Sequence, residues 1–279
     1  GLLKNGAGPT VMVRAELDAL PVEEKTGLPY ASTVRTKDDA GVDVPVMHAC
    51  GHDLHMAIGI GTATLLAQHK DQWHGTLMFV GQPAEERVLG ARAMLAAGLF
   101  TKFPRPDFAL SVHDSGNLPA GQVGYVPGYA LANSDSVTVT VFGRGGHGSA
   151  PQATIDPIVV AARMITAWQT IVSRENSPFD PAVVTVGSIH GGTKGNIIPD
   201  QVELLGTIRT LSDRAAAQIE ERIAQITRGL SAASRATIDV TYRRGTGAVD
   251  NDPVVTAVCV RAAGEVVGAG NVEEIRLPS

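Results

Sequence analysis

The sequence is poor in cysteine, in basic charge and in long hydrophobic runs, and each shortage excludes a class of protein. Two cysteines, Cys50 and Cys259, cannot build the disulfide framework of a small secreted scaffold, and they are compatible with a cytoplasmic location. A net charge of −5 and a pI near 5.9 argue against nucleic acid or an anionic membrane as a partner. No apolar run approaches the roughly 18 residues of a membrane span, so none is predicted.

The remaining composition is that of an ordinary soluble α/β protein. Hydrophobic residues make up 44% of the 279 residues, and 31 glycines supply the tight turns that such folds need. This length predicts one large or two moderate domains. The chain begins at Gly1 instead of a methionine, and we expect both ends to continue in a longer protein.

Residues 47–55 (MHACGHDLH) concentrate metal-binding chemistry in a short segment. Cys50 and His52 stand two positions apart, and in an extended or turning backbone such side chains point the same way, so both can bind one ion. Thiolate and imidazole suit zinc or another late first-row metal. The alternative is a buried cysteine beside an Asp53 that caps the following helix.

Three predicted strands end at further side chains that can bind metal. They are Asp18 after strand 10–16, Glu85 and Glu86 after strand 75–81, and His113 after strand 107–112. Ligands bind at the carboxyl ends of strands in open α/β sheets, so these side chains and Cys50 are expected to meet at one edge. Of two adjacent glutamates, one can bind a metal while its neighbour transfers protons. Alternatively, Asp18 caps a turn, and the two glutamates form an exposed acidic turn.

The spacing of apolar residues predicts a helix over 53–68, with Asp53 as its N-cap. His55 falls in the first turn of this helix, where it either reaches the metal-type side chains or faces solvent. The preceding residues 22–45 show little periodicity and are predicted to form a surface loop.

After Gly128 the strands acquire one polar face, which predicts antiparallel pairing. The expected elements are strand 134–142, helix 155–173, strands 182–189 and 201–210, helix 213–232 and strand 237–243. This β-α-β-β-α-β order predicts a ferredoxin-like domain inserted into the first one. Helix 252–267 and strand 272–277 follow it, and Cys259 is expected in the core.

Two other features of the sequence bear on function. Residues 143–148 (GRGGHG) match G-x-G-x-x-G, but no helix follows directly, so a dinucleotide-binding site is not predicted. A nucleophilic Cys50 paired with a histidine stays open, although the surrounding metal-type side chains favour a ligand.

Six motifs occur in the order of a known family. They are 14–21 (RAELDALP), 48–55 (HACGHDLH), 82–86 (QPAEE), 145–148 (GGHG) with Pro151, 196–200 (NIIPD) and 206–210 (GTIRT). With these motifs the chain resembles the metal-dependent amidohydrolases and metallopeptidases that include hippurate hydrolase, aminoacylase and the indole-acetyl-amino-acid hydrolases. The resemblance covers nearly the whole chain.

The resemblance implies an α/β fold with two parts. Residues 1–127 and 246–279 would form a three-layer α/β/α metallopeptidase-like catalytic domain, and residues 128–245 an inserted two-layer ferredoxin-like lid. The lid would join two copies of the chain into a homodimer. The implied activity is hydrolysis of the amide bond of an N-acyl amino acid or a related small peptide-like substrate.

The resemblance also implies roles for particular residues. Two divalent ions, Mn²⁺ or Zn²⁺ with Co²⁺ or Ni²⁺ as alternatives, would be held by Cys50, His52, Glu86 and His113. Glu85 corresponds to the general base, Asp18 to its supporting aspartate, and His147 to a lid histidine that steadies the tetrahedral intermediate. Asn196 and Arg209 correspond to lid residues near the substrate, where Arg209 would pair with a carboxylate.

The chain departs from the family pattern at two points. Glu16 stands where relatives have aspartate, and a further histidine ligand of relatives falls in a C-terminal segment that these 279 residues do not include. The alternative function is therefore a catalytically inactive protein that binds metal or an acyl amino acid. Retention of Glu85 beside Glu86 favours the enzyme, because binding alone needs no free base.

Overall fold

The computed structural model describes residues 1–275, and its contacts divide the chain into two units. The first unit is Gly1–Asn117 and the second unit is Leu118–Ser279. Within the described residues, no helix combines the length and the apolarity needed to cross a membrane.

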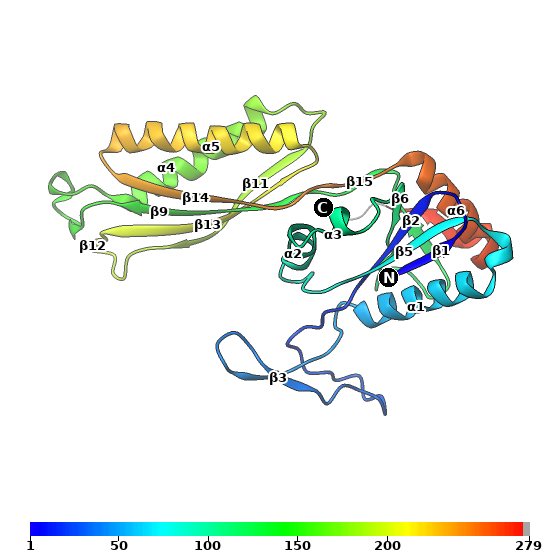
Figure 1. Ribbon diagram of the computed structural model, residues 1–279. Helices are drawn as coiled ribbons and strands as arrows, with labels where there is room; N and C mark the ends of the chain where they lie inside the picture. Colours follow the sequence, from blue (N-terminus) through cyan, green and yellow to red (C-terminus); the bar gives the residue numbers. More distant parts are fainter. Residues whose placement is uncertain (276–279) are drawn as a thin grey trace. The chain divides into compact units, whose positions relative to one another are not determined.

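The first unit is built on a four-stranded sheet in the order β1–β5–β2–β6 (Figure 1). Its strands are β1 (Leu2–Asn5), β2 (Thr10–Glu16), β5 (Gly75–Gln82) and β6 (Phe108–Leu110). β2 lies parallel to β5 and to β6, whereas β1 pairs antiparallel with β5. The register pairs Glu16 with Gln82 and Val13 with Leu110, so the chain beyond Leu110 continues towards the level where β2 and β5 end. The carboxyl ends of the parallel strands therefore form one rim, as the sequence predicts.

Helix α1 (His52–Gln68) packs against β2 and β5 through a narrow face. Its buried residues are His52, His55 and Gly59, which follow the spacing of one helical face. Gly59 allows the close approach, because a Cβ there would lie 2.3 Å from the ring of Phe79. The helix begins at His52 and no side chain caps it, so the predicted cap at Asp53 is wrong.

Residues 22–45 contain a hairpin that the lack of periodicity concealed. Its strands are β3 (Arg35–Lys37) and β4 (Asp43–Pro45), which pair antiparallel. Asp38 holds the turn, because its carboxylate accepts hydrogen bonds from the N–H groups of Ala40 and Val42. The other short helices of this unit are η1 (Lys70–Gln72), α2 (Gly90–Ala96) and α3 (Leu99–Lys102).

The second unit contains an antiparallel sheet in the order β11–β13–β9–β14, with α4 and α5 on one face (Figure 1). Its elements are β9 (Ser134–Phe142), α4 (Pro157–Thr170), β11 (Ala182–His190), β13 (Gln201–Thr210), α5 (Asp213–Ser234) and β14 (Thr237–Thr246). The element order is β-α-β-β-α-β, close to the predicted bounds. A role as lid or dimer interface, and the boundaries at 128 and 245, stay predictions.

Alternation places every second residue of β9 in the core of this unit. Val137, Val139 and Val141 are buried against helix residues that include Met164 and Trp168. Both long helices begin at a side-chain cap: Asp156 accepts from the N–H groups at the start of α4, and Ser212 from one at the start of α5. Residues Ile171–Glu175 extend α4 as a π-helical turn, labelled η3.

The rest of the second unit consists of short pairs and one further helix. They are β7 (Val123–Tyr125) with β16 (Val272–Glu274), β8 (Gly128–Leu131) with β15 (Val249–Asn251), β10 (Gly146–His147) with β12 (Ile197–Ile198), η2 (Pro151–Ala153), α6 (Pro253–Val267) and η4 (Ala269–Asn271). Cys259 is exposed on α6, which has no buried residue within the described chain, so its predicted place in the core is wrong. The predicted strand 272–277 is observed to Glu274, and its last two residues lie outside the described range.

Candidate metal centre

Glu85 and Glu86 follow β5 on a turn with a constrained backbone. Ala84 has a φ of 49°, which residues with a Cβ rarely adopt. Gly90 closes the turn at a point where a Cβ would lie 1.5 Å from the carbonyl oxygen of Pro83. The turn therefore fixes two adjacent carboxylates at the rim of the sheet.

Asp18 connects this turn to helix α1. Its carbonyl oxygen lies 2.9 Å from Nδ1 of His52, and its carboxylate accepts a hydrogen bond of 3.0 Å from the N–H of Glu86. A carbonyl only accepts, so Nδ1 of His52 carries the proton and Nε2 presents its lone pair. Burial acts to raise the pKa of Asp18, but the backbone N–H groups of Glu86 and Glu85 outweigh it and hold that pKa below the usual value.

Cys50 and Asp114 both lie next to Gly51 at the rim. The Sγ atom of Cys50 lies 3.6 Å from Nε2 of His113. Gly51 has a φ of 70°, and a Cβ on it would lie 2.0 Å from Oδ1 of Asp114. Burial, together with a hydrogen bond to Glu86 and its charge, raises the pKa of the Cys50 thiol to about 11. A cation must displace the proton of this thiol in order to bind it.

Glu16, the last residue of β2, is buried beneath the histidines. One carboxylate oxygen lies 2.7 Å from Nη1 of Arg14. The other lies 3.5 Å from Nε2 of His52 and 2.8 Å from Nδ1 of His55. The carboxylate of Glu16 therefore links Arg14 to the two imidazoles beneath the rim.

Four groups of three side chains bring their ligand atoms within 4.8 Å of one another. They are Cys50–His52–His113, His52–Glu85–Glu86, Glu16–His52–His55 and His55–His113–Asp114. Among residues 1–275, Nε2 of His52, Nε2 of His55 and Oδ1 of Asp18 are buried without a hydrogen-bond partner, whereas Nδ1 of His55 faces the carboxylate of Glu16. Buried polar atoms rarely lack partners, and their gathering here is what an ion site produces.

Glu85 differs from its neighbour in its acid–base character. Burial, followed by the negative charges of Glu16 and Glu86, raises the pKa of its carboxyl group. A carboxylate with a raised pKa is a stronger base and transfers protons more effectively near neutral pH. The rim thus combines metal-type ligands with one carboxylate suited to proton transfer.

The structure brings together all the residues of the first unit that the sequence predicts for the site. It adds Glu16 and Asp114, which were not predicted as members, and it places His55, for which both alternatives were open, among the buried side chains of the rim. The signal for His55 is its spacing of three residues from His52, which places both on one face of a helix. Glu16 stands two residues before Asp18, whereas the sequence around Asp114 carries no such signal.

Three predicted site residues belong to the second unit. His147 in β10 pairs with Ile197 in β12, and the carbonyl oxygen of Asn196 accepts a hydrogen bond from the N–H of Gly148. His147 and Asn196 therefore lie close together. Arg209 stands eight residues along β13 from Gln201, or about 27 Å at 3.4 Å per residue, so it does not join them.

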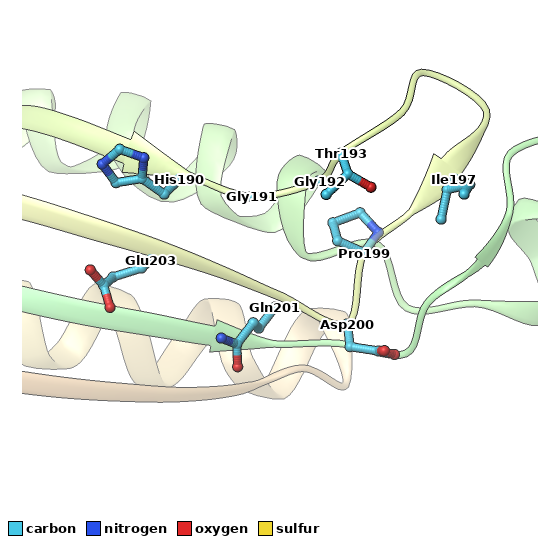
Figure 2. Close-up of a pocket in the computed structure, with 9 residues that line it drawn as sticks. All are labelled: His190, Gly191, Gly192, Thr193, Ile197, Pro199, Asp200, Gln201 and Glu203. Carbon is cyan, nitrogen blue, oxygen red and sulfur yellow. The ribbon is translucent and has the colours of Figure 1, made fainter.

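The second unit contains a pocket with a volume of about 470 Å³, and Figure 2 shows the residues that line it. Side chains at the adjoining ends of β11 and β13 line it, among them His190, Asp200 and Glu203. The carboxylate of Asp200 accepts a hydrogen bond from the N–H of Gly145 and so supports the neighbouring loop. Ile197 also lines the pocket. It follows Asn196, the residue that the family resemblance assigns to the substrate.

Comparison with known proteins decides the family. The sequence model described as peptidase family M20/M25/M40 matches residues 12–279. The chain belongs to the M20/M25/M40 peptidase family. Its fold is the fold of that family: the structure of the Bacillus subtilis YXEP protein, described as a dinuclear metal-binding peptidase of the M20 family, matches with a TM-score of 0.77 and 32% identity over 100% of this chain and 69% of that one.

Two curated relatives are named for an activity. The chain is 38% identical to the N-acetyl-L-cysteine deacetylase of Bacillus subtilis (strain 168), over 92% of this chain and 59% of that protein. It is 40% identical to the N-acetyldiaminopimelate deacetylase of Leuconostoc citreum (strain KM20), over 88% of this chain and 61% of that protein. The chain thus spans about three fifths of the length of these relatives.

Proposed function

We propose that this chain carries the metal centre of an amidohydrolase that cleaves the amide bond of N-acyl amino acids. The observation that carries the proposal is the convergence of a thiol, two imidazoles and two adjacent carboxylates on one rim of the first unit. A protein that merely binds metal has no use for a free carboxylate of raised pKa beside the ligands, so Glu85 favours the enzyme over the inactive alternative.

The side chains on the rim fit a pair of divalent ions. Cys50, His52, Glu86 and His113 supply sulfur, nitrogen and oxygen donors, and the unpaired Nε2 of His52 points among them. This donor set suits Zn²⁺, Mn²⁺, Co²⁺ or Ni²⁺. The dinuclear metal site named for the B. subtilis structure supports two ions.

When bound, the ions supply Lewis acidity, which polarises the amide carbonyl and acidifies a water molecule at the rim. Glu85 takes the proton from that water and returns it to the leaving amine. Asp18 positions its neighbours: its carbonyl oxygen fixes the tautomer of His52, and its carboxylate accepts a hydrogen bond from the backbone N–H of Glu86. We assign His147 to the reacting carbonyl, and Asn196 and Arg209 to the substrate, on the family motifs alone.

The names of the relatives narrow the substrate class. Both act on N-acetylated amino acids, one on the cysteine and one on the diaminopimelate derivative. We propose an N-acetyl amino acid as the substrate on this ground. A homodimer formed through residues 128–245 and a location in the cytoplasm stay predictions.

The test compares two glutamates in the full-length protein. Release of free amino acid from N-acetyl-L-cysteine and N-acetyldiaminopimelate is measured after chelation and after addition of Mn²⁺ or Zn²⁺. We expect Glu85→Gln to keep its metal content and to lose about 10²–10⁴-fold in kcat, the magnitude of general-base catalysis. Glu86→Gln should instead lose metal. Turnover that survives both chelation and Glu85→Gln would refute the proposal.

A further inference from the structure

The ring of His147 is contacted at Nδ1 by Ser149, which stands two positions further along the chain. Both residues are exposed, and His147 ends the short strand β10. The backbone N–H of Ser149 donates a hydrogen bond of 3.2 Å to Nδ1, and the hydroxyl oxygen of Ser149 lies 2.7 Å from the same nitrogen. Exposed side chains ordinarily exchange between rotamers within nanoseconds. The two contacts therefore restrict a ring that would otherwise rotate.

The backbone donor fixes which nitrogen of His147 carries the proton. An amide N–H only donates, so Nδ1 accepts, and the proton of the neutral ring stands on Nε2. The hydroxyl of Ser149 can rotate to suit its partner, so it donates to Nδ1 as well. The opposite end of the ring is thus an N–H donor, which is the kind of group that stabilises a developing oxyanion.

Two histidines of the first unit show the opposite arrangement. Nδ1 of His52 lies 2.9 Å from the carbonyl oxygen of Asp18, and Nδ1 of His113 lies 2.7 Å from the carbonyl oxygen of Asp114. A carbonyl only accepts, so these rings carry the proton on Nδ1 and present the lone pair of Nε2, as a metal ligand must. The partner of Nδ1 therefore separates these two ligands from His147, which is a hydrogen-bond donor.

The backbone around His147 is anchored as well. The N–H of Ala150 donates a hydrogen bond of 2.9 Å to the carbonyl oxygen of His147, which closes a four-residue turn. The N–H of Gly148 donates one of 2.9 Å to the carbonyl oxygen of Asn196. The chain that carries the ring is thus held in place, and the contacts of Ser149 add control over the side-chain torsions.

We propose that Ser149 is a positioning residue, which holds the ring of His147 in the orientation and the tautomer that present Nε2–H to the reacting carbonyl. The proposal rests on the proposed function, because His147 is assigned to that carbonyl there. Ser149 acts through the ring and does not touch the substrate. One ordinary hydrogen bond shifts an equilibrium by about 2–10-fold, which sets the size of the expected effect.

The first experiment measures the hydrolysis of N-acetyl-L-cysteine by the full-length protein. Ser149→Ala removes the hydroxyl, and it should lower kcat about 2–10-fold with KM unchanged, because the oxyanion forms only in the transition state. Ser149→Thr keeps the hydroxyl and should restore kcat. The matched control is Ser173→Ala, which removes a hydroxyl bonded to the carbonyl oxygen of Gln169 and should leave kcat at the wild-type value. An unchanged kcat in Ser149→Ala, or a raised KM alone, would overturn the proposal.

A double variant shows whether Ser149 acts through His147. His147→Ala should lower kcat about 10²–10³-fold, the magnitude measured for one oxyanion-hole donor. In that background Ser149→Ala should have no further effect, because the ring on which it acts is absent. A further loss as large as the one in the wild type would mean that Ser149 acts elsewhere.

Nitrogen NMR of protein labelled at its histidines gives a measurement without turnover. The spectra are recorded with Zn²⁺, which is diamagnetic, at mildly alkaline pH, and His147→Ala identifies the signals of that ring. We expect the proton on Nε2, and an Nδ1 signal that moves towards that of a free acceptor in Ser149→Ala and stays in place in Ser173→Ala. A proton on Nδ1, or an Nδ1 signal that Ser149→Ala leaves unmoved, would overturn the proposal. The Glu85→Gln assay tests the proposed function and these spectra test the ring, so the two failures are distinguishable.

Discussion

Replacing Gly51 by alanine should disturb the rim more than the same change at a comparable glycine. Gly51 has a φ of 70°, and its missing Cβ would lie 2.0 Å from Asp114 Oδ1 and 2.3 Å from its Cγ. Gly27 has a φ of 72° with nothing within 4 Å of the same position. The two sites thus share the backbone penalty and differ in the steric one.

The magnitudes follow from these two terms. A left-handed alanine costs about 1 kcal/mol relative to glycine, so Gly27→Ala should lower the free energy of unfolding by about that amount. Gly51→Ala adds the displacement of the Asp114 carboxylate, and overpacking of this kind costs typically 1–3 kcal/mol. The expected total is about 2–4 kcal/mol. In the double variant Gly51→Ala/Asp114→Ala the steric part should vanish, which leaves about 1 kcal/mol.

Urea unfolding of the four proteins measures these differences, and Trp73 reports on the first unit. Its indole donates a hydrogen bond of 2.9 Å to the carbonyl oxygen of Leu66 at the end of α1. Co²⁺ affinity measured on the same samples shows whether the displaced Asp114 also disturbs the ligands. Equal destabilisation by Gly51→Ala and Gly27→Ala, or no recovery in the double variant, would refute the reasoning.

Three further predictions concern the acid limb of the pH profile of activity, the turn that carries Glu85 and Glu86, and the N-cap of α4. Burial and two neighbouring carboxylates raise the pKa of Glu85 above its ordinary 4.5, and a base acts only when deprotonated, so kcat/KM should fall as the pH drops through that raised value. In Glu16→Gln the fall in kcat/KM should occur at lower pH, because one of the negative charges that raise the pKa of Glu85 is removed. An unchanged pH profile in this variant would show that Glu85 is not the group that titrates. Gly90→Ala should lower metal affinity at least 10-fold, because its Cβ would lie 1.5 Å from the Pro83 carbonyl oxygen and the turn must shift. A metal content equal to that of the wild type, measured by mass spectrometry, would contradict this prediction. Asp156→Ala should lower the free energy of unfolding of the second unit by about 1 kcal/mol, and Asp156→Asn by less, since asparagine also caps; equal losses in denaturation would exclude a capping role.

Periodicity predicted the second unit well. Strands β9 and β13 match their predicted bounds, because their strict alternation reports directly which residues face the core. The start of α1 was misplaced, because the left-handed Gly51, and not the side chain of Asp53, precedes the helix. The hairpin at 35–45 was missed because the carboxylate of Asp38 determines its turn, a contact that an alternation pattern does not contain.

The site was predictable where chemistry and position coincide in the sequence. Cys50, His52 and Glu86 stand at element ends, and the parallel register brings those ends together. Glu16 and Asp114 required three-dimensional information, because one is buried by the helix that packs over it and the other is admitted by the missing side chain of its neighbour. Sequence patterns report which face of an element is buried, and they do not report such contacts between distant segments.

The assembly of the rim from four separated segments links metal supply to the survival of the protein. An unfolded chain scatters these donors, so an ion that binds the folded form alone stabilises it by about 2.7 kcal/mol at a concentration 100 times its dissociation constant. In a cell that lacks the ion the folded protein would lose this stabilisation, and the carboxylates at the rim would repel one another. Cellular proteases act on unfolded chains, so the abundance of this protein should follow the availability of its metal.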